Sequence, residues 1–324
     1  MTAPMQDMPA QSVSEIVLLG LPIQSGTQLR GCSMGPSALR TAGLAEALME
    51  QGHTVEDAGD VSIAPQSDRT MEVAAWAKAA DAKAFEVSQG KRFPIFMGGD
   101  HSMALGTINA MARRARDQER DLIVLWLDAH SDYNTPETTP SGNIHGMPVA
   151  GLCGEPGMDF IFEGMDRVGV MPADFQLFGI RSVDRIERQL LARRGVSVMD
   201  MRLIDEKGVS HLVGGILEDV KRRNAMLHVS LDVDFLDPSI APAVGTTVPG
   251  GATYREAHLI MEMLSDSELV TSMDLAELNP FLDERGKTSL LLVDLVTSLF
   301  GKKIIDRAPQ DVNRMQGPDW NSGV

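Results

Sequence analysis

Carboxylates and imidazoles recur at a spacing of two residues in one short segment of this sequence. Asp128, His130 and Asp132 follow directly after an apolar run, and Asp232 and Asp234 repeat the spacing later in the chain. Residues two apart point to the same side of an extended chain, whereas on a helix they do not face one another. Each segment, if extended, can direct its side chains at one point.

A third segment adds His101, which follows the glycine pair at 98–99, where the backbone can turn tightly. Any one of these acids, taken alone, is most simply a turn or helix-capping residue. As a group they repel, since two carboxylates about 4 Å apart cost roughly 4 kcal/mol at an effective dielectric constant of 20. The motifs contain no lysine or arginine, so two divalent cations are the expected counter-charge for four carboxylates.

The ligand types narrow the choice of metal. Oxygen and imidazole without thiolate favour a catalytic site over a structural zinc site. Carboxylates suit manganese or magnesium, and imidazole also tolerates cobalt, nickel or zinc. We expect manganese, with two ions bridged by aspartates that activate a water between them.

The elements that must position these residues follow from the apolar pattern. Six apolar runs predict buried strands at 15–22, 93–99, 122–128, 175–180, 227–233 and 269–275. Helical spacing of apolar residues occurs between them, for example at 35–52, 71–89 and 287–303. This alternation predicts one α/β domain with three α/β/α layers and a mainly parallel sheet. Ligand sites in such sheets lie beyond the carboxyl ends of the strands, where several of these runs meet acids and histidines.

The composition indicates which classes of molecule the protein can bind and where in the cell it works. The net charge of −16 argues against nucleic acid and favours a small cationic substrate, although most of the acids can serve solubility alone. We expect no membrane segment, because no apolar run reaches the ~18 residues that a spanning helix needs. Two cysteines and no secretory signal favour a cytoplasmic protein.

Longer motifs resemble the ureohydrolase family, and within it the arginases. They are GGDHS (98–102), DAHSDYNTPETTPSGNIHGMP (128–148), SLDVDFLDPSIAPAVGTTVPGG (230–251) and ELNP (277–280). The resemblance implies an arginase-like fold of about eight strands, with a catalytic domain at 14–306. The polar ends of the chain, 1–13 and 307–324, are expected to be flexible. It implies hydrolysis of L-arginine to L-ornithine and urea by a hydroxide bridging two Mn²⁺ ions. Another ureohydrolase, such as an agmatinase or guanidinobutyrase, is the alternative.

The resemblance also assigns metal ligands. It implies that one ion is bound by His101, Asp128, Asp132 and Asp232, and the other by Asp128, His130, Asp232 and Asp234. Asp128 and Asp232 would bridge the two ions.

Catalytic and substrate roles are implied in the same way. The catalytic residues would be Asp132, His145 as a proton shuttle, and Glu277 as a partner of the substrate guanidinium. Taken alone, His145 reads as a solvated loop residue and Glu277 as the partner of a local arginine. Substrate-binding positions are Asn134, Thr139, Ser141, Asn143, Asp184, Glu187 and Thr246. Hydroxyls and amides in 134–143 also commonly form plain turns, but they suit an α-carboxylate, which agmatine lacks.

Two positions depart from the family pattern. Tyr133 stands where many relatives carry Ile, and Ile144 where Leu is common. The first is expected to alter the pocket wall. The resemblance further implies a homotrimer or homohexamer.

Overall fold

The computed structural model describes residues 14–303. The predicted termini at 1–13 and 307–324, and the last residues of the predicted domain, lie outside the described residues. Within them, one eight-stranded sheet has the order β2-β1-β3-β8-β7-β4-β5-β6, and all its paired strands are parallel. The strands are β1 (Glu15–Leu21), β2 (Thr54–Asp60), β3 (Phe93–Gly98), β4 (Leu122–Leu127), β5 (Phe175–Ile180), β6 (Ser197–Asp200), β7 (Met226–Asp232) and β8 (Val270–Ala276).

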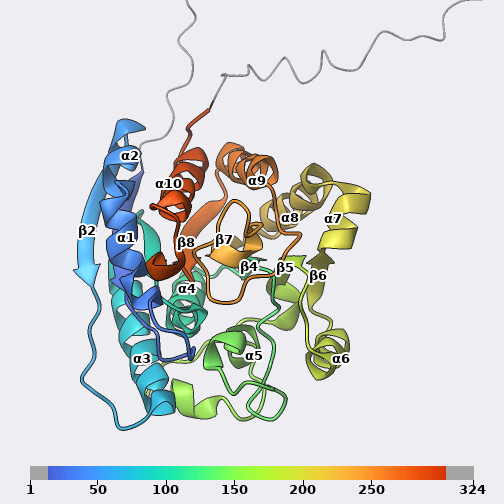
Figure 1. Ribbon diagram of the computed structural model, residues 1–324. Coiled ribbons are helices and arrows are strands. Elements are labelled where there is room, and N and C mark those ends of the chain that lie inside the picture. Colours follow the sequence, from blue (N-terminus) through green and yellow to red (C-terminus); the bar gives the residue numbers. More distant parts are fainter. Residues whose placement is uncertain (1–13, 304–324) are drawn as a thin grey trace, which may run out of the picture.

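Helices cover both faces of this sheet (Figure 1), so the predicted three-layer α/β/α fold is confirmed. One layer contains α1 (Gly35–Thr41), α2 (Leu44–Glu50), α7 (Met201–Lys207), α8 (Val209–Arg223), α9 (Tyr254–Ser267) and α10 (Lys287–Leu299). The other contains α3 (Arg69–Val87), α4 (Ala104–Asp117), α5 (Pro148–Leu152) and α6 (Arg185–Arg194).

Strand β4 shows how the sequence builds two cores at once. All six of its residues are buried. Leu125 and Leu127 pack into the core beneath α7–α10, while Val124 and Trp126 pack into the core on the α3–α6 side. Because side chains alternate across a strand, a continuous apolar run is what a sheet covered on both faces requires.

The six apolar runs all became strands, but the two edge strands gave no such signal. In β2 every residue is at least partly exposed, and β6 has four residues, of which one is buried. An edge strand packs less of its surface, so its sequence lacks the apolar run that reveals a central strand.

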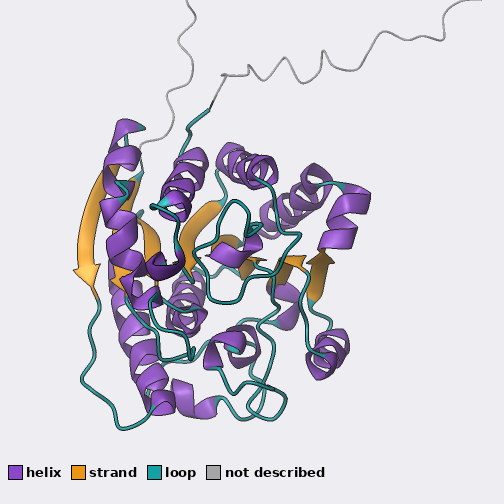
Figure 2. Cartoon of the chain, in the orientation of Figure 1, coloured by secondary structure: helices purple, strands orange, loops and turns teal. Residues whose placement is uncertain are grey.

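The predicted helical segment 35–52 is divided. Helix α1 ends at Thr41 and α2 begins at Leu44, with Gly43 between them at φ 83°. That backbone conformation suits glycine and interrupts a helix. The long loops that follow the strands are visible in Figure 2. None of the helices in residues 14–303 is long and apolar enough to cross a membrane.

Candidate active site

Five neighbouring strands deliver the candidate residues to one edge of the sheet. In the order β3, β8, β7, β4, β5, their carboxyl ends lead to His101, Glu277, Asp232, Asp128 and Asp184. Parallel strands place these ends side by side, so residues far apart in sequence meet.

His101 faces a group of carboxylates. Its Nδ1 lies 3.0 Å from Asp232 Oδ2, 3.2 Å from Asp128 Oδ2 and 3.5 Å from Asp132 Oδ2. The other ring nitrogen, Nε2, lies 2.8 Å from Ser230 Oγ, and the ring stacks on Trp126 at 4.0 Å between centroids. The imidazole is therefore held with one nitrogen directed at the acids.

His130 occupies the other side of Asp128. Its Nδ1 lies 3.0 Å from Asp234 Oδ2 and 3.6 Å from Asp128 Oδ1. Ligand atoms of Asp128, His130 and Asp234 lie within 4.8 Å of one another, as do those of His101, Asp128 and Asp232. Asp128 is common to both groups, which is the arrangement expected of a bridging ligand. Asp232 belongs to the first group alone.

The pKa shifts of these acids and histidines show how strongly their charges interact. Burial raises the pKa of Asp132, Asp232 and Asp234, and neighbouring carboxylates raise each pKa further. Burial lowers the pKa of His101, but Asp128 and Asp232 outweigh it and hold that pKa well above its usual range. Carboxylates gathered in this way repel one another, and a nearby cation would stabilise their ionised forms. Four carboxylates and two imidazoles of this kind fit two divalent metal ions.

Two candidate residues have strained backbones. Asp132 has φ 47° and Glu277 has φ 64°, in the left-handed region that non-glycine residues rarely adopt. The Glu277 amide donates to Gly99 O at 2.7 Å, which fixes this turn at the end of β8. Strain of this kind costs about 1–3 kcal/mol and is concentrated at functional sites.

Glu277 connects His101 with His145. Its Oε1 accepts a hydrogen bond from the His101 amide at 2.8 Å and lies 2.7 Å from His145 Nδ1. Burial lowers the pKa of His145, but the Glu277 carboxylate outweighs it and raises the pKa to about 9. His145 therefore carries a proton at neutral pH and is equipped to donate it.

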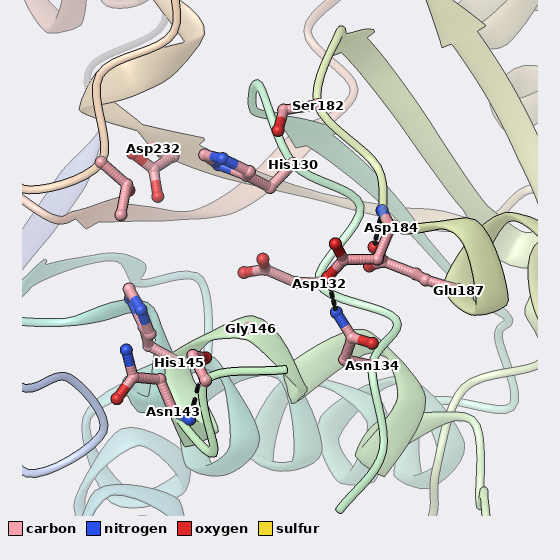
Figure 3. A pocket seen from close by; sticks show the side chains of 12 residues that line it. His130, Asp132, Asn134, Asn143, His145, Gly146, Ser182, Asp184, Glu187 and Asp232 are labelled. Atoms are coloured by element: carbon pink, nitrogen blue, oxygen red, sulfur yellow. Dashed lines mark hydrogen bonds between the residues drawn. The ribbon is translucent and has the colours of Figure 1, made fainter. Parts of the chain in front are cut away.

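A pocket of about 210 Å³ opens beside the acids (Figure 3). Figure 3 shows the Asp132 carboxylate pointing toward its centre, between His130 and His145. The lining comprises His130, Asp132, Asn134, Ser141, Asn143, His145, Gly146, Ser182, Asp184, Glu187, Asp232 and Thr246. His101, Asp128, Asp234 and Glu277 are buried and are not part of this lining.

The predicted substrate-binding residues separate into two groups. Six line the pocket, whereas Thr139 does not; its hydroxyl accepts a hydrogen bond from the Gly142 amide at 3.0 Å and shapes the loop. Glu187 lines the pocket, but its oxygens accept from Ser131 Oγ and from the amides of Tyr133 and Asp184. It is thus placed to hold the backbone around Asp184.

Sequence reasoning missed residues that hold the ligands. Trp126 Nε1 donates to Asp128 Oδ2 at 2.9 Å, and Ser230 contacts His101. Both lie two residues before a predicted ligand in a strand, so the same-face rule that paired the acids would also have found them. Ser182, beyond the end of β5, lines the pocket and was also missed.

Known proteins match this chain along most of its length. The arginase family model matches residues 14–301. The chain belongs to the arginase family. The arginases of Brucella melitensis biotype 1 and Agrobacterium fabrum are 52% and 51% identical to it, covering 90% of this chain and 97% and 92% of theirs.

Solved arginase-family structures agree. The structure of arginase from Bacillus subtilis superposes with a TM-score of 0.83 at 41% identity, covering 90% of this chain and 100% of the other. The resemblance inferred from the motifs is thereby confirmed, and the chain is an arginase-family hydrolase that acts on a guanidino group.

Proposed function

We propose that this protein hydrolyses L-arginine to L-ornithine and urea, with two Mn²⁺ ions bound at the strand ends. The observation that supports it best is the pair of ligand groups sharing Asp128, beside a pocket with room for a small substrate. His101, Asp128, Asp132 and Asp232 would hold one ion; Asp128, His130, Asp232 and Asp234 would hold the other. Such ions lower the pKa of a bound water and thus supply the nucleophile.

Glu277 is proposed to orient the guanidinium. Its Oε1 is occupied by the His101 amide and His145, so Oε2 is left for a charge-assisted hydrogen bond from the substrate. Burial raises the pKa of this carboxyl, but His145 outweighs it and lowers the pKa, so the group stays ionised. A substrate guanidinium bound to Oε2 would lie beside the ligand groups, because Glu277 also contacts the backbone of His101.

His145 is proposed to protonate the leaving amine. It lines the pocket, and its protonated form is stabilised by Glu277. Its backbone amide donates to Gly26 O at 3.2 Å, which holds the residue in place within its loop. General acid catalysis of this type requires a pKa near the working pH.

The amino-acid end of the substrate is proposed to lie against the polar side of the pocket. Asp184 lines the pocket and accepts a hydrogen bond from Asn134 Nδ2 at 3.1 Å, and its carboxylate would meet the α-amino group there. Neutral donors of Asn134, Ser141, Asn143 and Thr246, with Thr139 shaping the loop, would meet the α-carboxylate directly or through water. These donors would distinguish arginine, which has an α-carboxylate, from agmatine, which has none.

The test is a comparison of substrates. Metal-loaded protein is assayed for urea with L-arginine, agmatine and 4-guanidinobutyrate, and kcat/KM is compared. Preference for arginine is expected. Preference for either other compound would replace arginase with another ureohydrolase activity, and absence of urea from all three would exclude both.

We further propose that the protein is cytoplasmic and assembles as a homotrimer or homohexamer. The oligomer is proposed from the family resemblance, whereas the location is proposed from the two free thiols, Cys32 and Cys153, which suit a reducing compartment. Light scattering of the purified protein will give the oligomer mass.

A further inference from the structure

Tyr133, which departs from the family pattern, does not line the pocket. Its side chain is fully buried, and its hydroxyl donates to Glu155 Oε1 at 3.0 Å. A buried tyrosine hydroxyl needs a partner, and burial raises its pKa, so it keeps the proton that it donates. Any effect of Tyr133 on the pocket wall must therefore be indirect, because its hydroxyl contacts Glu155 and the residue is not part of the lining.

Glu155 joins Tyr133 to the end of a helix. This carboxylate is 3% exposed and accepts two hydrogen bonds from Arg194, at 2.6 Å from Nε and 2.8 Å from Nη2. Arg194 is the last residue of α6. A bidentate arginine–carboxylate pair fixes the relative orientation of the two side chains as well as the distance between them.

The same segment of chain also holds the beginning of α6. The Tyr133 amide donates to Glu187 Oε1 at 2.9 Å, and Glu187 Oε2 accepts from the amide of Asp184, the residue before α6. Asn134 contacts the Asp184 carboxylate, as Figure 3 shows. Residues 133–134 are thus connected to both ends of α6, to its last residue through Glu155 and to its first turn through Glu187 and Asp184.

We propose that Tyr133 is a positioning residue: through Glu155 and Arg194 its hydroxyl fixes α6 and so holds Asp184 where it receives the α-amino group of the substrate. The proposal rests on the proposed function, since it takes arginine as the ligand of Asp184. It makes Tyr133 a determinant of substrate affinity that has no contact with the substrate.

The variant Tyr133→Phe tests this with little disturbance. It keeps the ring that fills the core and removes one donor from the buried Glu155. Arginine KM is expected to rise about threefold, a fraction of the effect of one lost hydrogen bond, with kcat changed less than twofold. The competitor 5-guanidinopentanoate, which lacks the α-amino group, should keep its inhibition constant.

The chain offers a matched control. Tyr254, the only other tyrosine, also donates its hydroxyl to a carboxylate, that of Asp294, outside the site. Tyr254→Phe should leave both constants unchanged. Equal changes for arginine and the competitor in Tyr133→Phe, or no change in either, would overturn the proposal.

A second measurement does not depend on activity. Amide hydrogen exchange in 185–194 should be faster in Tyr133→Phe and in Arg194→Gln, and no faster in the double variant than in the single variants, because both act through Glu155. Unchanged exchange would refute the positioning role even if the kinetics moved. Wild-type protein that releases no urea from arginine would instead count against the proposed function.

Discussion

Asp128→Asn is the substitution that separates a shared metal ligand from an ordinary buried acid. The Asp128 carboxylate is fully buried and both its oxygens are engaged. Oδ1 accepts from the His130 amide at 2.6 Å and Oδ2 from Trp126 Nε1 at 2.9 Å. Asparagine has nearly the same shape but is neutral and has one acceptor oxygen.

Those contacts set the expected loss in the free energy of unfolding of Asp128→Asn. The asparagine NH₂ group must face one of the two donors, which costs about 1–3 kcal/mol for the donor left unpaired. Removal of the Asp128 charge relieves its repulsion of Asp132 and Asp234 but also removes its attraction for His101 and His130. The metal-free variant should therefore fold, with a modest loss in its free energy of unfolding.

The affinity for manganese should fall far more than the folding stability. Residues that only support a metal ligand change affinity by about 10–100-fold, so loss of an anionic ligand shared by two ions should exceed roughly 100-fold. At manganese concentrations that saturate the wild type, turnover of the variant should fall below roughly 1%.

The assay combines manganese titration by calorimetry with urea release and urea-induced unfolding of the metal-free protein. Asp81→Asn is the control, since Asp81 is also buried but pairs with Arg113 and Asn109 away from the site. Two bound ions and near-normal turnover in Asp128→Asn would refute the shared-ligand assignment. Loss of manganese in Asp81→Asn would show that burial alone explains the effect.

Three other outcomes are expected. His145→Ala should bind manganese normally but slow turnover by about 10²–10⁴-fold; a larger loss of metal than of rate would make it a ligand. Turnover of the wild type should decline as pH rises through about 9, since Glu277 raises the His145 pKa to that value and the proton it donates is lost above it. A decline of equal size in His145→Ala would assign it to another group. Trp126→Phe removes the donor to Asp128 and should weaken manganese binding about 10–100-fold; unchanged affinity in a titration would contradict this.

The sequence predicted the central part of the sheet because those strands are buried on both faces. Each central strand is a continuous apolar run, and polar residues appear where it leaves the core. The edge strands β2 and β6 are not buried in this way, so the same reasoning passed over them. The break at Gly43 depends on a single backbone angle, which apolar spacing does not reveal.

The site was predicted to the extent that it depends on strand ends. Same-side spacing predicted that Asp128, His130 and Asp132 would converge on an extended chain. They do lie close together, but through turns: residues 128–129 bend, Asp132 has φ 47°, and Asp234 lies in a 3₁₀ turn at Val233–Phe235. The parallel sheet brought His101 and Asp232 to them. What the sequence did not predict are contacts made by long side chains across the fold. Figure 1 places α5 and α6 on the same side of the sheet, and Glu155, which follows α5, contacts both Tyr133 and Arg194, the last residue of α6.

Diffraction from crystals of the protein grown with manganese, collected at the manganese absorption edge, tests the central claim most directly. We expect two anomalous peaks about 3.5–4 Å apart, with Asp128 between them and His101 and His130 on opposite sides. A single peak, or none among these residues, would contradict the account.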